Sequence, residues 1–233
     1  MRASYITGVG MMPFGAHWDV PVERMGAEVV IAALADAELR REEIGAVYVG
    51  HMSQGEMAGQ RILRELDFPP LPVVNIENAC ASGAAALREA WIAVAAGIVD
   101  TALVIGIEKL AQRGLLRMQH RTLDQAMGQI IPGSYAIAAQ RHMAEYGTRP
   151  EQLAWISVKN HDNGAENPYA TYRKRCTLEE VMASRPIADP LTLLQCCAPT
   201  SGAAAAVVAS AAVARRRRTP RPARLLWSEV VAD

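Results

Sequence analysis

The chain has 233 residues, of which 51% are hydrophobic and 21% are charged. This composition is typical of a soluble globular protein, and the length allows one large domain or a domain with an insertion. Lys plus Arg number 24, as do Asp plus Glu, so no overall positive charge favours binding to nucleic acid. The basic run at residues 215–218 fits the last turn of a helix, where basic side chains complement the helix dipole.

The N-terminus lacks the apolar segment of a signal peptide, and no run of about 18 apolar residues predicts a membrane span. The cysteines Cys80, Cys176, Cys196 and Cys197 are irregularly spaced, which is typical of neither a disulfide framework nor a metal-binding CxxC pattern. We therefore expect a protein of a reducing, cytoplasmic compartment without a metal site.

The first hundred residues alternate between short apolar runs and longer stretches with apolar residues at helical spacing. The predicted strands are residues 5–10, 46–50, 71–76 and 101–107, and the predicted helices begin at Pro21 or span residues 55–66 and 81–96. Apolar strands separated by helices indicate an α/β fold with a mostly parallel sheet flanked by helices on both faces.

From about Lys109 the sequence becomes polar and rich in helix-forming residues. We expect helices over residues 133–146 and 150–162, with turns at Asn163-Gly and Asn167-Pro. A third, short helix is expected after Thr177, because the sequence Thr-Leu-Glu-Glu is a capping box. We interpret this stretch as an insertion into the α/β core.

The sequence returns to small apolar residues over 202–209. Ser210 is expected to cap a short helix, and residues 224–231 are strand-like. The adjacent Cys196 and Cys197 are expected to be buried strand residues, because a disulfide between neighbouring residues is strained.

Cys80 lies between a predicted strand and a predicted helix, in the segment Ile76-Glu-Asn-Ala-Cys-Ala-Ser-Gly. A cysteine at the start of a helix meets free N–H groups and the positive end of the helix dipole, which both favour a thiolate. Its small neighbours leave room for a ligand, and ligands of open α/β sheets bind at the carboxyl ends of strands. The residues alone support a reactive cysteine and a small buried cysteine equally.

The segment Asn75-Ile-Glu-Asn-Ala-Cys-Ala-Ser-Gly-Ala-Ala-Ala-Leu resembles the nucleophile segment of thiolases. It is most similar to the branch related to sterol-carrier-protein thiolases, also described as lipid-transfer proteins or acetyl-CoA acetyltransferases. Further segments resemble that branch in the same order along the chain, at residues 6–15, 104–109, 141–147, 158–170 and 187–197. The resemblance covers essentially the whole chain and corresponds to the N-terminal half of a thiolase.

The resemblance implies a βαβαβαβ core with a helical loop-domain insertion. Residues 1–108 would form the first part of the core, residues 109–188 the loop domain, and residues 189–233 the return to the core and the start of a C-terminal half. The expected partner is a second copy of the chain or a complementary C-terminal half.

The resemblance also implies the chemistry. Cys80 would accept an acyl group from an acyl-CoA thioester and pass it to CoA or to a second acyl-CoA, in a Claisen or retro-Claisen reaction. His161 and Asn163 are candidates for positions near the CoA channel. CoA thioesters are then substrates, and no cofactor is expected.

Several family features are absent from this sequence. The family completes its site with a His in a Gly-His-Pro segment, a second Cys in a Gly-rich loop and an Asn- or His-containing motif, none of which occurs in these 233 residues. After Cys196-Cys197 the family usually has an Asp, where this chain has Ser201, so a polar anchor is lost or replaced there.

Two hypotheses therefore remain for the function. The chain is an acyltransferase segment whose active site is completed elsewhere, or it is a non-catalytic thiolase-like remnant or assembly subunit. A cysteine hydrolase is not supported, because no His, Asp or Asn pattern accompanies Cys80. Surface or hydrogen-bonded structural roles are expected for all five histidines, His17, His51, His120, His142 and also His161, for which a position near the CoA channel is the alternative.

Overall fold

The computed structural model describes residues 1–110, 123, 127–128, 130–216 and 222–231. The chain forms two compact units, Met1–Lys109 with Ser201–Asp233 and Leu110–Thr200. The second unit contains almost all of the expected insertion and continues beyond residue 188 to Thr200. The assignment of these ranges to the core, loop domain and C-terminal half of the family stays a prediction.

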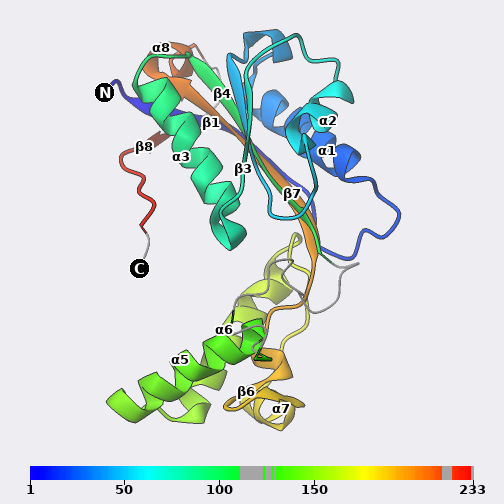
Figure 1. Ribbon diagram of the computed structural model, residues 1–233, viewed down its shortest axis with the longest axis vertical. Coiled ribbons are helices and arrows are strands. Elements are labelled where there is room, and N and C mark those ends of the chain that lie inside the picture. The colour runs from blue at the N-terminus through cyan, green and yellow to red at the C-terminus, as the bar shows by residue number, and fades with distance from the viewer. Residues whose placement is uncertain (111–122, 124–126, 129, 217–221, 232–233) are drawn as a thin grey trace. The chain divides into compact units, whose positions relative to one another are not determined.

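The first unit is built on a six-stranded sheet with the strand order β3-β2-β4-β7-β1-β8 (Figure 1). The strands are β1 (Ser4–Met11), β2 (Ala46–Gly50), β3 (Val73–Ile76), β4 (Thr101–Lys109), β7 (Ser201–Ser210) and β8 (Ala223–Leu225). β2 pairs in parallel with β3 and β4, whereas β7 pairs antiparallel with β4 and β1, and β8 antiparallel with β1. The expected parallel pairing is thus confined to β2, β3 and β4. Because β4 and β7 are joined through residues 110–200 and not by a crossover helix, they are free to pair antiparallel.

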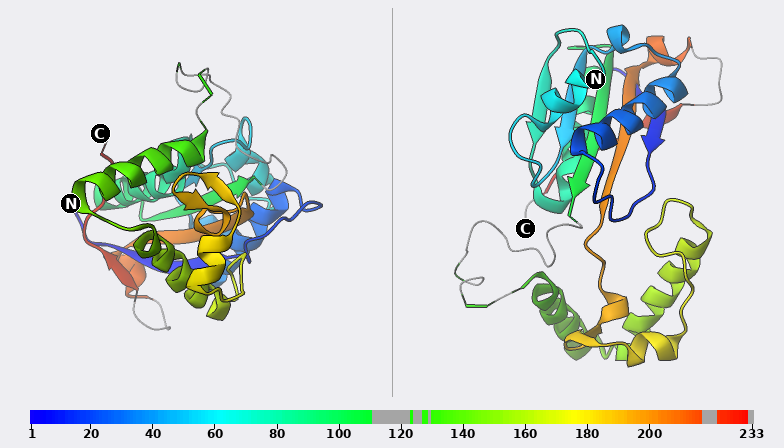
Figure 2. Two further views of the ribbon diagram at one scale, coloured as in Figure 1. Left: turned by 90° about the horizontal axis from the view of Figure 1, so that it is seen from below. Right: turned by 90° about the vertical axis from the view of Figure 1, so that its right-hand side faces the viewer.

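Helices cover both faces of this sheet, as expected (Figures 1 and 2). α1 (Val22–Ala37) and α2 (Ala58–Arg64) contribute to the larger core cluster on one face, which includes the fully buried Met25 and Ile62. α3 (Ser82–Ala95) lies on the other face, where alanines such as Ala86 and Ala90 pack against β4 and β7. These small side chains let the helix axis approach the sheet closely.

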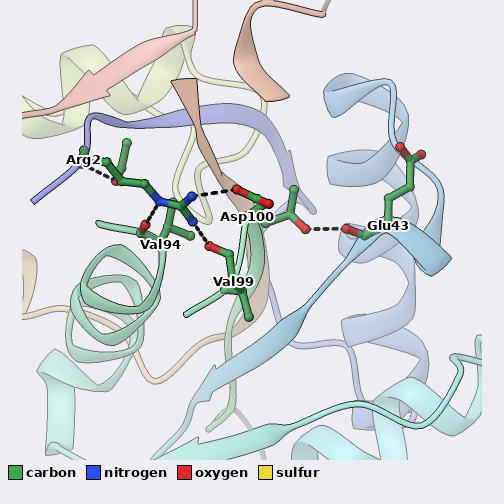
Figure 3. Close-up of polar contacts among 7 residues, drawn as sticks. Arg2, Glu43, Val94, Val99 and Asp100 are labelled. Atoms are coloured by element: carbon green, nitrogen blue, oxygen red, sulfur yellow. Dashed lines mark hydrogen bonds and ion pairs between the residues drawn. The ribbon is translucent and has the colours of Figure 1, made fainter. Parts of the chain in front are cut away.

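Arg2 connects the beginning of the chain to the turn between α3 and β4 (Figure 3). Its Nε donates to the carbonyl of Val94 at 2.5 Å, one terminal nitrogen donates to Oδ1 of Asp100 at 2.8 Å, and the other donates to the carbonyl of Val99. Nearby, the hydroxyl of Thr101 donates to the carbonyl of Glu43. These contacts secure the amino end of β4, opposite the edge where the parallel strands end.

The end of the described chain differs from the expected long strand. β8 comprises only Ala223–Leu225, because its pairing with β1 is limited to three residues. Further along, the ring of Trp227 packs against Trp91 of α3, with ring centroids 6.5 Å apart. Ser210 precedes the short helix α8 (Ala211–Ala214) as expected, but its side chain makes no capping hydrogen bond. Arg215 follows that helix as its C-cap, whereas residues 217 and 218 lie outside the described residues.

The second unit contains the predicted helices, as α5 (Ile131–Tyr146), α6 (Pro150–Glu166) and α7 (Leu178–Ala183), and a two-stranded sheet of β5 (Pro186–Ala188) and β6 (Leu191–Thr192). The turn expected at Asn163-Gly is wrong, because α6 continues to Glu166. A Cβ on Gly164 would lie 2.9 Å from the carbonyl oxygen of Tyr172. The glycine therefore allows a loop to approach the helix, and the helix ends instead at Asn167.

The capping box at Thr177 is confirmed. The Thr177 hydroxyl accepts a hydrogen bond from the N–H of Glu180 at 3.2 Å, and the Glu180 carboxylate accepts one from the N–H of Thr177 at 2.9 Å. This cap positions the fully buried Val181 in the small core against α6. The cap should therefore contribute to the stability of the second unit.

We expect Thr177→Ala to destabilise this unit by about 1 kcal/mol, since the N–H of Glu180 loses its partner. Thr177→Ser, which keeps the hydroxyl, serves as the matched control. Native-state hydrogen exchange of the Glu180 amide measures the effect locally. Equal protection of this amide in the two variants would contradict a stabilising role for the cap.

No helix in the part of the chain that the structure describes is both long and apolar enough to cross a membrane.

Candidate functional site

Cys80 lies in a 3-10 turn, Ala79–Ala81, that joins the carboxyl end of β3 to α3. The residue is exposed and its thiol is free. The preceding Ala79 has a φ of 44°, in the left-handed region that is unfavourable for a residue with a Cβ. Cys80 is therefore found at the expected strand-to-helix junction, on a strained turn, and it is not the buried cysteine of the alternative interpretation.

Three side-chain hydrogen bonds support this turn, in addition to its backbone hydrogen bonds. The hydroxyl of Ser82 accepts from the N–H of Asn78 at 2.8 Å and donates to the carbonyl of Ala79 at 2.7 Å. Oε1 of Glu77 accepts from the N–H of Ala79 at 2.7 Å. Because Ser82 is 4% exposed, its role is to fix the backbone on both sides of Cys80.

Glycines let the first turn of α3 rest directly on the ends of two parallel strands. Gly50 at the end of β2 is aligned with Gly106 in β4. A Cβ on Gly50 would lie 2.5 Å from the carbonyl carbon of Ser82 and 2.6 Å from the nitrogen of Gly83. Gly83 in turn faces Gly106, where an added Cβ would make only ordinary contact. The position of Cys80 therefore depends on the missing side chain at residue 50.

Glu108, near the end of β4, holds the loop that follows β2. Its carboxylate accepts from the N–H of Met52 at 2.7 Å, from the hydroxyl of Ser53 and from the side-chain amide of Gln54. Arg61 of α2 also holds this loop by donating to the carbonyl of Gln54 at 2.7 Å. Sequence reasoning did not single out Glu108 as a site residue. The available signal was its place near the carboxyl end of a predicted strand, β4, which β2 separates from the strand that leads to Cys80.

His51 directly follows β2, and its N–H donates to the carbonyl of Ile76 at 3.1 Å. The side chain is half-buried, and among the described residues its Nδ1 is buried without a hydrogen-bond partner. Burial lowers the pKa of His51 below its usual value, an effect opposed by the carboxylates of Glu108 and Glu77 and reinforced by Arg61. The expected surface or hydrogen-bonded role is therefore wrong for this ring nitrogen.

The other described histidines outside the candidate list do make hydrogen bonds. Nε2 of His17 bonds to the carbonyl of Pro13 at 2.7 Å, and Nδ1 of His142 bonds to the hydroxyl of Thr148 at 2.9 Å. The expectation of hydrogen-bonded roles is confirmed for these two residues. His120 lies outside the described residues.

A separate pocket of about 420 Å³ lies within the second unit, and His161 is among its lining residues. Nδ1 of His161 donates to the carbonyl of Lys174 at 3.0 Å, and its ring stacks on Tyr172 with centroids 5.9 Å apart. Asn163 is exposed on α6 and is not among the residues that line the pocket. The structure thus separates the two candidates, placing His161 in a pocket and Asn163 on the surface.

Cys196 and Cys197 also line this pocket, and they are not the buried strand residues that the sequence suggested. They follow the 3-10 turn Leu193–Gln195, with Cys196 half-buried and Cys197 exposed. The strand begins only at Ser201, which is fully buried and exchanges two backbone hydrogen bonds with Gly15, at 2.7 and 3.0 Å. Burial raises the pKa of the Cys196 thiol, and the neighbouring Cys197 adds to this rise. Within the described residues, no group of three or more His, Cys, Asp or Glu side chains could hold a metal ion.

Comparison with known proteins gives a consistent result. The family profile of the thiolase N-terminal domain matches residues 4–212. An acetyl-CoA acetyltransferase of Methanothermobacter thermautotrophicus is 38% identical over 206 residues, which cover 84% of this chain and 54% of that protein. Sterol carrier protein 2 of Gallus gallus is 33% identical over 213 residues, covering 84% of this chain and 39% of that protein. The solved structure of an Ltp2-ChsH2(DUF35) aldolase matches with a TM-score of 0.78 at 27% identity, covering 92% of this chain and 57% of that one.

The chain therefore spans about half of the length of the acetyltransferase, and less of sterol carrier protein 2. The matched range contains the whole strand-to-helix turn of Cys80 and the parallel strands β2, β3 and β4. The resemblance seen in the sequence is thus confirmed, and so is the α/β fold that it implied. This chain belongs to the thiolase family, as a match to its N-terminal domain.

Proposed function

We propose that this chain supplies the acyl-accepting part of a thiolase-type acyltransferase, with Cys80 as the nucleophile. The observation that carries this proposal is the exposed thiol on a strained turn at the start of the 14-residue helix α3. Membership of the thiolase family supports it, as does the similarity to a protein named acetyl-CoA acetyltransferase. A nucleophile between a strand and a helix is open to a ligand at the carboxyl edge of the sheet.

In the proposed reaction the thiolate of Cys80 attacks the carbonyl carbon of an acyl-CoA thioester. The bond between the carbonyl carbon and the sulfur of CoA breaks, CoA leaves as its thiolate, and the acyl group stays on Cys80. A second CoA thiolate, or the carbanion of a second acyl-CoA, then attacks the acyl-cysteine and releases Cys80 as a thiolate. The free N–H groups in the first turn of the helix favour the negative charge that develops on the carbonyl oxygen.

We infer that the remaining catalytic groups come from residues outside these 233. Deprotonation of Cys80 and movement of the α-proton need a general base, and no histidine of the described residues is hydrogen-bonded to Cys80. A further segment of the protein or a second chain would supply these groups. Without this base the chain alone would accept an acyl group only slowly, through the fraction of Cys80 that ionises to water, and it would not turn over.

The second unit is proposed to contact the CoA part of the substrate. His161 is the main candidate, because its ring is held by Lys174 and Tyr172 at the wall of a pocket. Asn163 is a second candidate on the exposed surface of the same helix. Each contributes binding and not bond making in this proposal.

The test is acyl transfer to the purified chain from acetyl-CoA, mapped by proteolysis and mass spectrometry. We expect one acetyl group on the peptide that contains Cys80, and release of one CoA per chain without continued turnover. Cys197 is an internal control, since it is also an exposed, free cysteine. Absence of the acyl group from Cys80 would support the non-catalytic assembly subunit, and sustained release of CoA would contradict an incomplete site.

A further inference from the structure

Polar residues lie at the carboxyl ends of the three parallel strands β2, β3 and β4, which is the edge of the sheet where Cys80 lies. His51 follows β2, Glu77 follows β3, and Glu108 is near the end of β4. The register aligns Gly50 with Ile76 on one side and with Gly106 on the other, so the residues that follow lie at the same edge of the sheet. The N–H of His51 extends the pairing with β3 by its hydrogen bond to Ile76.

The ring of His51 is partly buried beside charged side chains, and one of its nitrogens lacks a hydrogen-bond partner among the described residues. Its Nδ1 is buried and has no hydrogen-bond partner within the described ranges, which costs free energy and therefore calls for an explanation. The charged groups that act on it are Glu77 after β3, Glu108 in β4 and Arg61 in α2. Because burial lowers the pKa of His51, the ring is neutral at pH 7 and gains a proton only below the ordinary value of about 6.5.

The carboxylates of Glu108 and Glu77, which both act on His51, accept hydrogen bonds from different segments. Glu108 is occupied by three donors from the loop at residues 52–54. Glu77 instead accepts the N–H of Ala79, the residue directly before Cys80. Since Ala79 has an unfavourable positive φ, its turn depends on such support. Any charge that competes for the Glu77 carboxylate therefore acts on the turn that presents Cys80.

We propose that His51 is a positioning residue for Cys80, acting through the hydrogen bond between Glu77 and Ala79. While the ring of His51 is neutral, the Glu77 carboxylate stays on the N–H of Ala79. A proton taken up from solvent makes the ring a cation that attracts this carboxylate, and the turn then presents the thiol less well. The proposal rests on the role proposed for Cys80, but it concerns the reactivity of the thiol and not acyl transfer.

The test measures the reaction of Cys80 with methyl methanethiosulfonate from pH 5 to pH 9, by quenching and peptide mapping. The thiolate displaces methanesulfinate and forms a methyl disulfide, so neither acyl-CoA nor any missing catalytic group is needed. For simple thiol ionisation, the logarithm of the rate rises with a slope of one per pH unit below the thiol pKa and levels off above it. We expect an additional step below about pH 6.5, in which the rate falls by a further factor of about three or more.

Variants separate the proposed link from general effects. His51→Gln should remove the additional step and leave a slope of one. Glu77→Gln should remove it as well, because the amide oxygen still accepts from Ala79 but no longer attracts a cation. Glu108→Gln should keep the step and move it to lower pH, because a carboxylate that raises the pKa of His51 is lost. Cys197, measured in the same samples, should show no additional step.

Two outcomes would overturn the proposal. The first is a wild-type profile that superimposes on that of His51→Gln, and the second is an additional step that persists in Glu77→Gln. Because the Glu77 variant retains His51, the test remains decisive even where His51→Gln does not fold. Failure of acyl transfer with these pH profiles intact would count against the proposed function alone.

Discussion

Replacing Gly50 by alanine should destabilise the first unit by about 3 kcal/mol and slow the reaction of Cys80 with thiol reagents. The added Cβ would lie 2.5 Å from the carbonyl carbon of Ser82 and 2.6 Å from the nitrogen of Gly83. Both are backbone atoms, so no side chain can rotate away to relieve the overlap. The first turn of α3 would have to move off the sheet, and Cys80 would move with it.

Gly83→Ala is the matched control for this prediction. It adds the same methyl group at the same helix-to-sheet contact, but its nearest neighbour would be the Cα of Gly106 at 3.9 Å. Since Gly83 lies within α3, the alanine should be neutral or stabilise the helix by about 0.5–1 kcal/mol. Urea unfolding measures both variants. Equal unfolding midpoints for the two would show that α3 does not need to lie this close to β2.

The core elements of the first unit could be predicted because their apolar spacing is local. The strands ending at Gly50 and Ile76 were recognisable from short apolar runs, and α1 from the repeat that includes Met25 and Val29. The direction of pairing was not predictable in the same way. Whether β7 runs parallel or antiparallel to β4 depends on how residues 110–200 fold between them, which no local pattern encodes.

The prediction at Asn163-Gly failed for a related reason. A glycine is typical of turns, but Gly164 is needed because the loop at Tyr172 approaches α6 closely. The same limit applies to Cys196 and Cys197, which were expected to be buried strand residues because neighbouring cysteines do not readily form a disulfide. They lie in a loop because strand pairing begins only at Ser201, which pairs with Lys109 of β4 and forms an isolated bridge with Gly15.

The features of the candidate site that depend on position along the sequence were predicted. The features that depend on which atoms are buried or hydrogen-bonded in the fold were missed. The position of Cys80 between a strand and a helix was predicted, while its role as the nucleophile stays a prediction. The unpartnered Nδ1 of His51 could not be found, because a histidine after a strand gives no sign of which ring atom is buried. Glu108 was missed because its importance comes from three donors on a loop more than fifty residues earlier in the chain.

Replacing Cys80 by alanine should abolish acyl transfer from acetyl-CoA while leaving the stability of the first unit within about 0.5 kcal/mol of the wild type. Acyl transfer should be lost because the exposed thiol is the proposed nucleophile. Stability should be little changed because an exposed side chain makes few contacts. The side chain contributes little to the core, so its removal creates no cavity. The three side-chain hydrogen bonds that support the turn come from Ser82 and Glu77, and they remain in the variant.

Cys80→Ser sharpens the prediction, because a serine hydroxyl stays protonated near neutral pH and is a weak nucleophile without an adjacent base. This variant should also remain unacylated although it fills the same space. Cys197→Ala, which removes an equally exposed cysteine from the other unit, should be acylated as the wild type is. Intact-mass spectrometry with acetyl-CoA measures the acyl group, and urea unfolding measures stability. A Cys80→Ala chain has no thiol at position 80 and cannot form a thioester there. If this variant acquired the acyl group at the wild-type rate, the nucleophile would have to be another residue.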